Sequence, residues 1–418
     1  MSLQDFLADP ILFISNWLQG LLVGWKLPSG LATVIVFLIG ILALVIFAML
    51  FDIFLVWVER KVVARFQDRL GPNRIGPFGL IQPFADIIKL VIKEDITPDG
   101  ADKVVYNIAP VLAAVSVIIL WAVLPLSSKI FGVDLNVAVL YLVAAGALGT
   151  LAIIMAGWSS NNKYALLGAY RMVANMVSYE IPMVVTLLIP TILADTMSLN
   201  GITQSQETIW YVFLSPLGML IFLISSIAEL GRSPFDLNEA ESEIVAGFHI
   251  EYSGMKFGWF YASELLHAFT FGGFVGILFF GGWQVPFLMA DGFHFGSFVV
   301  ALPGIGVILL QAVAFMVKAM IGYWVIMWVK YSMPRIRIDQ MLAFNWKFLT
   351  PLSLVLLSAT AVLTKLLSGF PLWIFGVGMF LSNLLIGWIT IEILRFYAHR
   401  QRRLEEPLAQ PASVAARR

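Results

Sequence analysis

Long apolar stretches, separated by short polar segments, run through almost the whole chain. A helix needs around 20 residues to cross about 30 Å of hydrocarbon. Because lipid offers no hydrogen bonds, the backbone of each stretch must satisfy itself, so each stretch is predicted to be a helix. Nine stretches are long enough to cross, near residues 31–58, 104–126, 137–158, 170–195, 210–230, 258–283, 301–329, 348–367 and 371–396.

An additional and more polar helix is predicted over residues 10–27. Asp9 suits the position that caps a helix, and Pro10 suits the first helical position. Asn16 and Gln19 interrupt the apolar run, which favours a helix lying in the membrane interface. A short extra span is the alternative.

The first long polar loop, residues 59–103, is expected to hold structure of its own. Arg65 and Arg69 alternate with apolar residues as on a basic amphipathic helix. Glycine and proline between residues 71 and 77 predict turns. A second helix is predicted after them, because polar residues recur at helical steps, at Gln82, Asp86, Lys89 and Lys93.

Composition fixes the broad class. Hydrophobic residues make up 60% of the 418 residues and charged residues 12%, with a mean hydropathy of +0.89. Soluble domains of this size do not have that composition, so the chain is predicted to be an all-α, polytopic membrane protein. Residues 31–396 are interpreted as one transmembrane domain, preceded by an interfacial helix within 1–30 and followed by a disordered cytoplasmic tail, 397–418.

The basic residues indicate an orientation. Most of the 26 lysines and arginines fall on one side if the N-terminus lies outside. The exceptions are Lys26, Lys129 and Lys365 on the other side and Lys318 within a span. Because basic residues concentrate in cytoplasmic loops, this pattern favours an odd number of spans and a cytoplasmic C-terminus.

Cysteine is absent, which excludes disulfides, thiolate zinc sites and cysteine-ligated iron–sulfur clusters in this chain. The four histidines are scattered and form no i, i+4 pair of metal ligands. No metal site is therefore predicted. If electrons pass through a complex that contains this chain, a partner carries them.

Six ionisable residues fall inside the apolar stretches. A charge at the bilayer centre costs roughly 2.5–3.5 kcal/mol even on the lenient insertion scale. Such residues must pair, stay protonated or line a wet cavity, and each of these options suggests movement of protons or ions. The six are Asp52, Glu180, Glu229, Glu264, Lys318 and Glu392.

Local context separates these residues. Glu180 precedes Pro182, which frees a backbone carbonyl and leaves a gap for water or a side chain. His267 lies one turn away from Glu264. The two are predicted to form either a pair that exchanges protons or a static hydrogen bond that holds two helices together. Lys318 is a candidate partner for one of the acids. Asp52 and Glu59 share a face of the first span, and Glu392 is expected to pair with Arg395.

An acidic segment joins the fifth and sixth spans. Five carboxylates fall within fifteen residues, against one arginine, Arg232. Crowded carboxylates titrate as a coupled set and can exchange protons near neutral pH. A solvated acidic loop with helix caps is the alternative, and the residues do not decide between them. The five are Glu229, Asp236, Glu239, Glu241 and Glu243.

Five blocks carry a family resemblance, in order, across roughly residues 31–367. They are Glu59–Lys61 with Arg69–Asn73, Pro77–Asp86, Gly157–Gly168, Ala228–Gly254 and Pro334–Gln340. The chain closely resembles the membrane subunit of respiratory complex I, NADH:quinone oxidoreductase, that lies where the peripheral and membrane arms join (the family that includes mitochondrial subunit 1 and its bacterial counterparts).

The resemblance implies a subunit that couples quinone reduction to proton translocation in an inner (cytoplasmic) membrane. Such subunits have no redox centre of their own. They form a quinone chamber with an iron–sulfur partner, so iron–sulfur clusters and FMN are expected in partner subunits. The expected substrate is ubiquinone or menaquinone, with NADH as electron donor. Small membrane subunits and lipid are the expected neighbours, and no nucleic acid is expected.

The resemblance also assigns residues. A proton pathway is assigned to Glu180, Glu229, Glu264, Asp236, Glu239, Glu241 and Glu243. The quinone chamber is assigned to Glu59, Arg60, Arg69, Asp86, Arg335 and Arg337. No residue of this chain is assigned as catalytic.

Departures and rival functions stand beside this interpretation. Lys330 takes a position where an arginine is common, and Ile338 replaces the family's tyrosine. His267 is unusual at its position, and Asp52 belongs to no matched motif. The rival functions are the related membrane subunit of an energy-converting hydrogenase, an independent proton-coupled transporter and a purely structural anchor.

Overall fold

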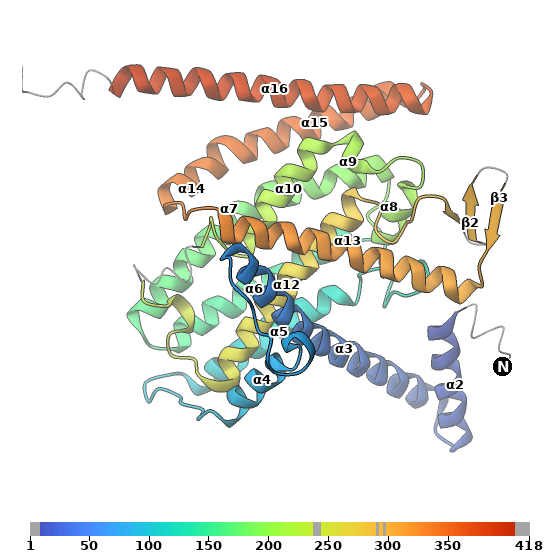
Figure 1. The fold of residues 1–418 in the computed structure, drawn as a ribbon, viewed down its shortest axis with the longest axis vertical. Coiled ribbons are helices and arrows are strands. Elements are labelled where there is room, and N and C mark those ends of the chain that lie inside the picture. Colours follow the sequence, from blue (N-terminus) through green and yellow to red (C-terminus); the bar gives the residue numbers. More distant parts are fainter. Residues whose placement is uncertain (1–8, 237–243, 290–291, 296–297, 406–418) are drawn as a thin grey trace, which may run out of the picture.

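The computed structural model describes residues 9–236, 244–289, 292–295 and 298–405, and most of them are helical (Figure 1). A small antiparallel sheet, in the order β1-β2-β3, consists of β1 (Leu288–Met289), β2 (Gly292–Phe295) and β3 (Phe298–Ala301). Within it Leu288 pairs with Phe293 and Phe293 with Val300. The helices are α2 (Pro10–Gly24), α3 (Ser29–Phe66), η1 (Pro77–Gly79), α4 (Gln82–Ile92), α5 (Lys103–Trp121), α6 (Ala138–Ser159), α7 (Lys163–Ala194), α8 (Leu199–Ser205), α9 (Tyr211–Leu214), α10 (Pro216–Glu229), η2 (Gly247–His249), α12 (Gly254–Phe279), α13 (Gly304–Ser332), α14 (Ile338–Phe344), η3 (Asn345–Leu349), α15 (Thr350–Leu367) and α16 (Leu372–Glu405).

The all-helical membrane fold is confirmed. Within the described ranges, eight helices are long and apolar enough to cross a membrane: α3, α5, α6, α7, α12, α13, the run from α14 through α15, and α16. Each coincides with a predicted span, within a few residues for most of them. α3 is longer than predicted, because it continues past the apolar stretch to Phe66 and carries Arg60, Lys61 and Arg65 of the first loop.

The stretch predicted as a single span over 210–230 is broken. Backbone angles of φ −139° and ψ 68° at Ser215 separate α9 from α10, which begins at Pro216. Proline has no N–H to donate and disfavours helical geometry in the residue before it, which accounts for the break. Hydropathy detects the apolar side chains but not this interruption of the backbone.

The N-terminal helix α2 begins as predicted. Asp9 caps it, with Oδ1 accepting a hydrogen bond from the Leu12 N–H at 3.1 Å, and Pro10 is the first helical residue. Its 15 residues give a length of about 22 Å, shorter than a span. Gln19 donates to the Thr33 hydroxyl at 3.0 Å and so joins α2 to the start of α3. Its location in the membrane interface stays a prediction.

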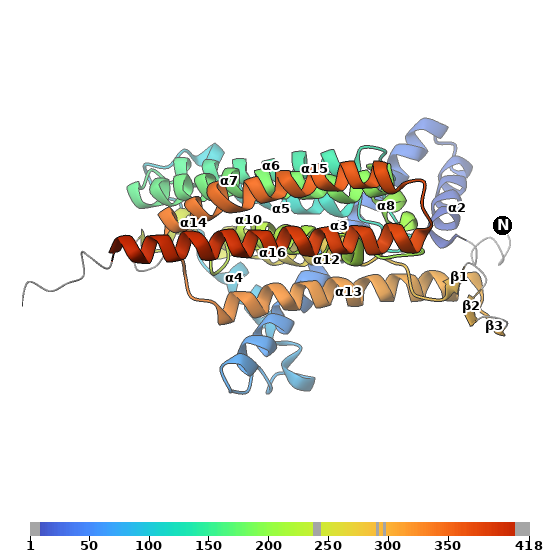
Figure 2. The same ribbon diagram turned by 90° about the horizontal axis from the view of Figure 1, so that it is seen from above.

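Helix α12 forms the centre of the bundle. Figure 2 shows α13 on one side of it and the layer of α5, α6 and α7 on the other. The crossing of α12 and α13 is close because glycines face each other: a Cβ on Gly272 would lie 2.6 Å from the Ala319 carbonyl oxygen. Small residues allow such close approach between membrane helices, and it fixes the two helices that carry most of the site.

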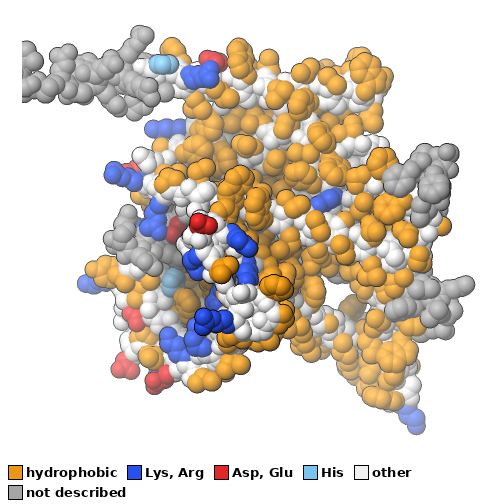
Figure 3. Space-filling model, in the orientation of Figure 1, with side chains coloured by type: hydrophobic (Ala, Val, Ile, Leu, Met, Phe, Trp, Pro, Cys, Tyr) orange, Lys and Arg blue, Asp and Glu red, His pale blue; other side chains and the backbone are white. Residues whose placement is uncertain are grey.

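The surface agrees with a membrane setting. Hydrophobic side chains cover most of the face in Figure 3, while most charged groups gather at its left end. The first loop, with α4, projects from the bundle in Figure 2. At the other end of the sequence α16 continues to Glu405, so helix extends beyond residue 397, where a disordered tail was predicted to begin.

Candidate functional site: a buried charge cluster beside three cavities

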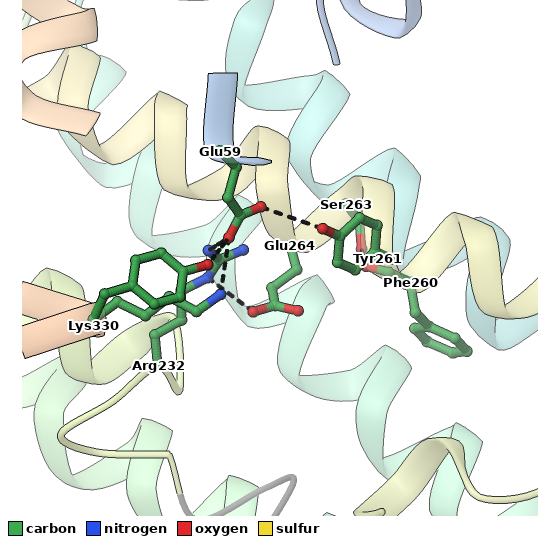
Figure 4. Close-up of polar contacts among 8 residues, drawn as sticks. Glu59, Arg232, Phe260, Tyr261, Ser263, Glu264 and Lys330 are labelled. Carbon is green, nitrogen blue, oxygen red and sulfur yellow. Dashed lines mark hydrogen bonds and ion pairs between the residues drawn. The ribbon is translucent and has the colours of Figure 1, made fainter. Parts of the chain in front are cut away.

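Glu59 is the centre of a buried charge cluster. It lies on the inner face of α3 and is 4% exposed. Its Oε1 accepts hydrogen bonds from Tyr331 Oη at 2.6 Å, Lys330 Nζ at 3.0 Å and Arg232 Nη1 at 3.3 Å. Its Oε2 accepts one from Tyr261 Oη at 3.3 Å (Figure 4). Three segments distant from Glu59 in sequence therefore converge on its carboxylate.

Arg232 links this carboxylate to a second one. Its side chain is 2% exposed, and its Nε lies 2.8 Å from Glu264 Oε1 on α12. Burial alone would lower the pKa of this guanidinium, but the carboxylates of Glu264 and Glu59 outweigh burial and raise it. Arg232 therefore stays charged and is shared between two acids.

The predicted pairing of Glu264 with His267 is not what the structure shows. Glu264 pairs with Arg232, and the His267 ring stacks on Phe271 with centroids 4.8 Å apart. The i+3 spacing placed both residues on one side of α12, but the buried guanidinium is a stronger partner for a carboxylate than a neutral imidazole.

The first cavity, which we name the chamber cavity, opens beside Glu59. Its volume is about 350 Å³, at the lower end of the range of small-molecule pockets, about 300–1,000 Å³. Hydrogen-bond donors dominate its polar lining. The lining residues are Glu59, Arg60, Val63, Arg69, Pro72, Tyr261, Lys330 and Tyr331.

The structure divides the residues assigned to the quinone chamber. Glu59, Arg60 and Arg69 line the chamber cavity. Asp86 is not among the lining residues but forms an ion pair with Arg60, which joins α4 to α3.

The remaining two basic residues of that group are not among the residues that line the cavity. Arg335 Nη2 instead forms a 2.7 Å ion pair with Oδ2 of Asp236, a residue assigned to the proton pathway. Arg337 is the residue before the first turn of α14.

Two further cavities share lining residues with the chamber cavity or with each other. The middle cavity, of about 90 Å³, is lined by Tyr261, Glu264, His267, His249 and Glu229, among others. The inner cavity, of about 20 Å³, is lined by Glu180, Glu229 and His267 together with apolar residues. Tyr261 lines the chamber and middle cavities, and Glu229 and His267 line the middle and inner cavities.

Glu229 lies between the last two cavities of this series. It ends α10, is 4% exposed, and its Oε2 has no hydrogen-bond partner among the described residues. The sequence did not decide whether it pairs with Arg232 or faces a cavity. In the structure Arg232 pairs with Glu59 and Glu264, and Glu229 lies between the middle and inner cavities. A buried, unpartnered carboxyl is suited to bind water.

The proline beside Glu180 has the predicted consequence. Pro182 lies inside the continuous helix α7, so the Ser178 carbonyl lacks its helical donor. The side-chain amide of Asn345, in η3, donates to that carbonyl. A side chain, which was one of the two predicted alternatives, thus fills the gap, at a carbonyl two residues before Glu180.

The acidic segment is described only in part. Asp236 is held by Arg335 as given above. Glu239, Glu241 and Glu243 lie outside the described residues, so their predicted crowding stays a prediction. His249, which follows the segment in η2, lines the middle cavity, and burial lowers its pKa from the ordinary value.

Three other ionisable residues complete the set from the apolar stretches. Lys318 meets no acid among the described residues, contrary to the prediction: its Nζ donates to the carbonyls of Gln284 and Phe280 at 2.6 and 2.7 Å. Carbonyl dipoles can replace a counter-ion for an ammonium group near a helix end. Glu392 pairs with Arg395 at 2.8 Å, as predicted. Asp52 is 7% exposed, and its Oδ1 has no hydrogen-bond partner in the described chain.

Sequence reasoning missed most of the partners of Glu59. Tyr261, Lys330 and Tyr331 were not candidates, because tyrosine and lysine near helix ends are common at membrane interfaces. One signal was present: Glu59 and Lys330 each lie at the cytoplasmic end predicted for their spans, and a carboxylate that is buried there requires a cation.

Comparison with known proteins extends these observations. The family model described as NADH dehydrogenase matches residues 39–361. The NADH-quinone oxidoreductase subunit designated H from Dehalococcoides mccartyi strain CBDB1 is 46% identical over 306 residues, which cover 73% of this chain and 80% of the relative. The same subunit of Geobacillus kaustophilus is 44% identical over 305 residues (73% and 86%), and that of Phocaeicola vulgatus is 40% identical over 363 residues (84% and 98%).

Proposed function

Because this chain belongs to the NADH dehydrogenase family and is a complex I membrane subunit like the relatives described above, we propose that its three cavities form one proton route leading from the quinone chamber. The observation that carries the proposal is the sharing of lining residues. Tyr261 borders the chamber and middle cavities, and Glu229 and His267 border the middle and inner ones.

The chamber cavity has the chemistry to receive a quinone headgroup. A quinone presents two carbonyl oxygens, which accept hydrogen bonds, and Lys330, Tyr331 and Arg60 supply donors along the wall. Reduction of a quinone to a quinol takes up two electrons and two protons. Partner subunits would deliver the electrons, and iron–sulfur clusters and FMN are expected there.

The shared arginine gives a way for that chemistry to reach the proton route. Negative charge arising in the chamber competes with Glu59 for Lys330 and Arg232. Any movement of Arg232 changes its contact with Glu264, which borders the middle cavity. The charge state or hydration of Glu264 and Glu229 would then follow the redox state of the quinone.

The energies involved are compatible with this role. An ion pair at about 4 Å is worth about 4 kcal/mol at an effective dielectric constant of about 20. Moving one charge across a potential of 100 mV requires about 2.3 kcal/mol. Altering one contact of Arg232 is therefore sufficient in magnitude to drive a proton, whereas an exposed surface pair, at about 0–1 kcal/mol, would not be.

Conservative replacement of the acids tests the route. Glu264→Gln and Glu180→Gln keep the size of each side chain and remove its charge. Both are expected to lower quinone reductase activity and proton pumping, while the amount of assembled complex and the NADH oxidation with a soluble artificial acceptor stay unchanged. Wild-type quinone reduction and pumping in a variant would remove that residue from the route.

The relatives described above carry the quinone oxidoreductase name, which favours this function over a hydrogenase subunit or an independent transporter. We infer further that the protein lies in the inner (cytoplasmic) membrane with its N-terminus outside, because the basic residues divide in that way. The small membrane subunits and the iron–sulfur quinone module are the proposed neighbours.

A further inference from the structure

Helix α16 lies beyond the region that the family model matches, which ends at residue 361. It runs along α15 and also contacts α9 and α10, the two parts of the broken span (Figure 1). Most of α16 is apolar, but it carries a buried amide near its middle, Asn383, which is only 2% exposed. A buried amide in a membrane helix requires partners for both its donor and its acceptor.

Asn383 finds those partners at the break between α9 and α10. Its Nδ2 donates to the Leu214 carbonyl at 3.0 Å, and its Oδ1 accepts from the Ser215 hydroxyl at 3.3 Å. The same Nδ2 also donates to Met379 within α16, at 3.1 Å. In an uninterrupted helix the Leu214 carbonyl would accept from the N–H of Gly218, four residues further on.

The other end of α9 is closed in a similar way. Gln206 Oε1 accepts hydrogen bonds from the Tyr211 N–H at 3.2 Å and the Gly281 N–H at 3.0 Å. Its Nε2 donates to the Ile277 carbonyl at 2.8 Å, which joins it to α12. The single turn of α9 is thus held by one buried side-chain amide at its start and by another at its end.

Side chains at the break also pack against glycines of α16 and α10. A Cβ on Gly376 of α16 would lie 3.4 Å from Cδ1 of Ile209 and 3.9 Å from Cδ2 of Leu214. A Cβ on Gly218 would lie 2.5 Å from the Ser215 hydroxyl. The Gly376 distances are those of ordinary van der Waals contact, so α16 lies directly against the residues on both sides of the break.

This break determines where α10 begins, and α10 ends at Glu229, between the middle and inner cavities. α10 is a rigid rod of 14 residues, so a rotation or a slide at its first turn carries over to its last. We propose that Asn383 is a positioning residue, which closes the break and thereby sets the placement of Glu229 in the proton route. This inference rests on the proposed function, because it concerns the route through Glu229.

Asn383→Ser is the variant that tests the proposal. A serine can donate to the carbonyl four residues earlier within its own helix, as Thr390 does to Ile386, but it is too short to reach α9. Ser382→Ala is the matched control, because within the described chain the Ser382 hydroxyl bonds to Met379 of the same helix and to no other element. Complexes carrying each variant are reconstituted in liposomes, and the rate, its pH profile and the number of protons pumped per electron are measured.

Asn383→Ser is expected to lower quinone reductase activity about fivefold, to shift its pH profile and to lower the protons pumped per electron. Ser382→Ala is expected to behave as wild type. Ser215→Ala, which keeps the bond to Leu214, is expected to show a smaller change in the same direction. Combining Ser215→Ala with Asn383→Ser should add little to the loss from Asn383→Ser alone, because both act on one contact.

Glu229→Gln, measured in parallel, separates the two ideas. If Glu229→Gln loses pumping while Asn383→Ser keeps the wild-type rate, pH profile and pumping ratio, the positioning role is wrong and the route stands. If Glu229→Gln also pumps normally, the route is wrong and the positioning role with it. An equal loss in Ser382→Ala, or failure of Asn383→Ser to assemble where Ser382→Ala assembles, would show that Asn383 serves only to hold the fold.

Discussion

At the scale of single residues, Glu59 and Arg232 are the two buried charges on which this site is built. Each is nine-tenths buried or more, and each has partners from more than one helix. Removing one member of a buried ion pair leaves an uncompensated charge, at a cost of about 3–5 kcal/mol. These two residues are therefore expected to be far more sensitive to substitution than the many exposed charges of the chain.

Replacing Arg232 by methionine is expected to destabilise the subunit by about 3–5 kcal/mol, because Glu59 and Glu264 lose their shared cation. The readout is the thermal unfolding temperature of the complex and the amount of subunit in the membrane. Arg395→Met is the control, since its pair with Glu392 is exposed and worth at most about 1 kcal/mol. Equal stability of the two variants would contradict the described cluster.

His249 should make stability depend on pH. Burial lowers its pKa in the folded chain, while the unfolded value is about 6.5. The folded state therefore prefers the neutral ring, and its stabilising contribution is complete above about pH 6.5 and is lost as the pH falls below that value. His249→Phe is expected to reduce this acid-induced loss in unfolding temperature, and the exposed His399→Phe is not. The same acid sensitivity in both variants would disprove the assignment.

Sequence alone singled out two of the buried carboxylates, Asp52 and Glu229, but neither the burial of Glu59 nor the arrangement of the acids. Glu180, Glu229 and Glu264 stood out because a charge within an apolar stretch is costly. Tyr331 and Lys330 did not, because only the fold brings the end of α13 against α3. A contact between residues 271 or 272 positions apart leaves no signal in local spacing.

At the scale of elements, hydropathy predicted where the apolar helices lie but not how each helix responds to a proline within it. Pro182 and Pro216 both remove a backbone donor, but with opposite results. α7 continues through Pro182 because Asn345 donates to the carbonyl left free at Ser178. The span at Pro216 is interrupted, and Asn383 donates to the carbonyl at Leu214. Apolar content predicted both segments, whereas the compensating amides come from distant helices.

The amide in η3 permits a direct test of this view. Asn345→Leu is expected to cost about 1–3 kcal/mol of stability, since it leaves the buried Ser178 carbonyl without a donor. Pro182→Ala restores the N–H that this carbonyl lacks. In the Pro182→Ala background the same Asn345→Leu change is expected to cost clearly less, as measured by thermal unfolding in a double-mutant cycle. Additive losses would show that Asn345 acts elsewhere.

At the scale of the whole molecule, the two ends of the helix bundle differ in how many charged side chains they carry. The charged groups gather where the chamber cavity and α4 lie, while apolar side chains cover most of the rest of the face (Figure 3). The alternation of basic loops predicted this division without the fold. The cavities, in contrast, could not be predicted, because they are the spaces that remain between packed side chains. Those side chains come from α3, α12 and α13 around the chamber cavity, and mainly from α5, α6, α7, α10 and α12 around the other two.

Labelling of single cysteines tests the predicted orientation, and the absence of natural cysteine in this chain keeps its background clear. Lys129→Cys and Lys365→Cys are expected to react with an impermeant maleimide added to intact cells. Lys89→Cys, in α4, is expected to react only after the membrane is opened. Labelling of Lys89→Cys in intact cells, with protection of the other two, would reverse the orientation.

The most direct test of the coupling route is the number of protons pumped per electron by the complex carrying Glu229→Gln, reconstituted in sealed liposomes with quinone. Because Glu229 borders the middle and inner cavities, the proposed route predicts that this ratio falls while electron transfer from NADH to a soluble artificial acceptor is retained. A wild-type ratio at a wild-type rate of quinone reduction would contradict a proton path through these cavities.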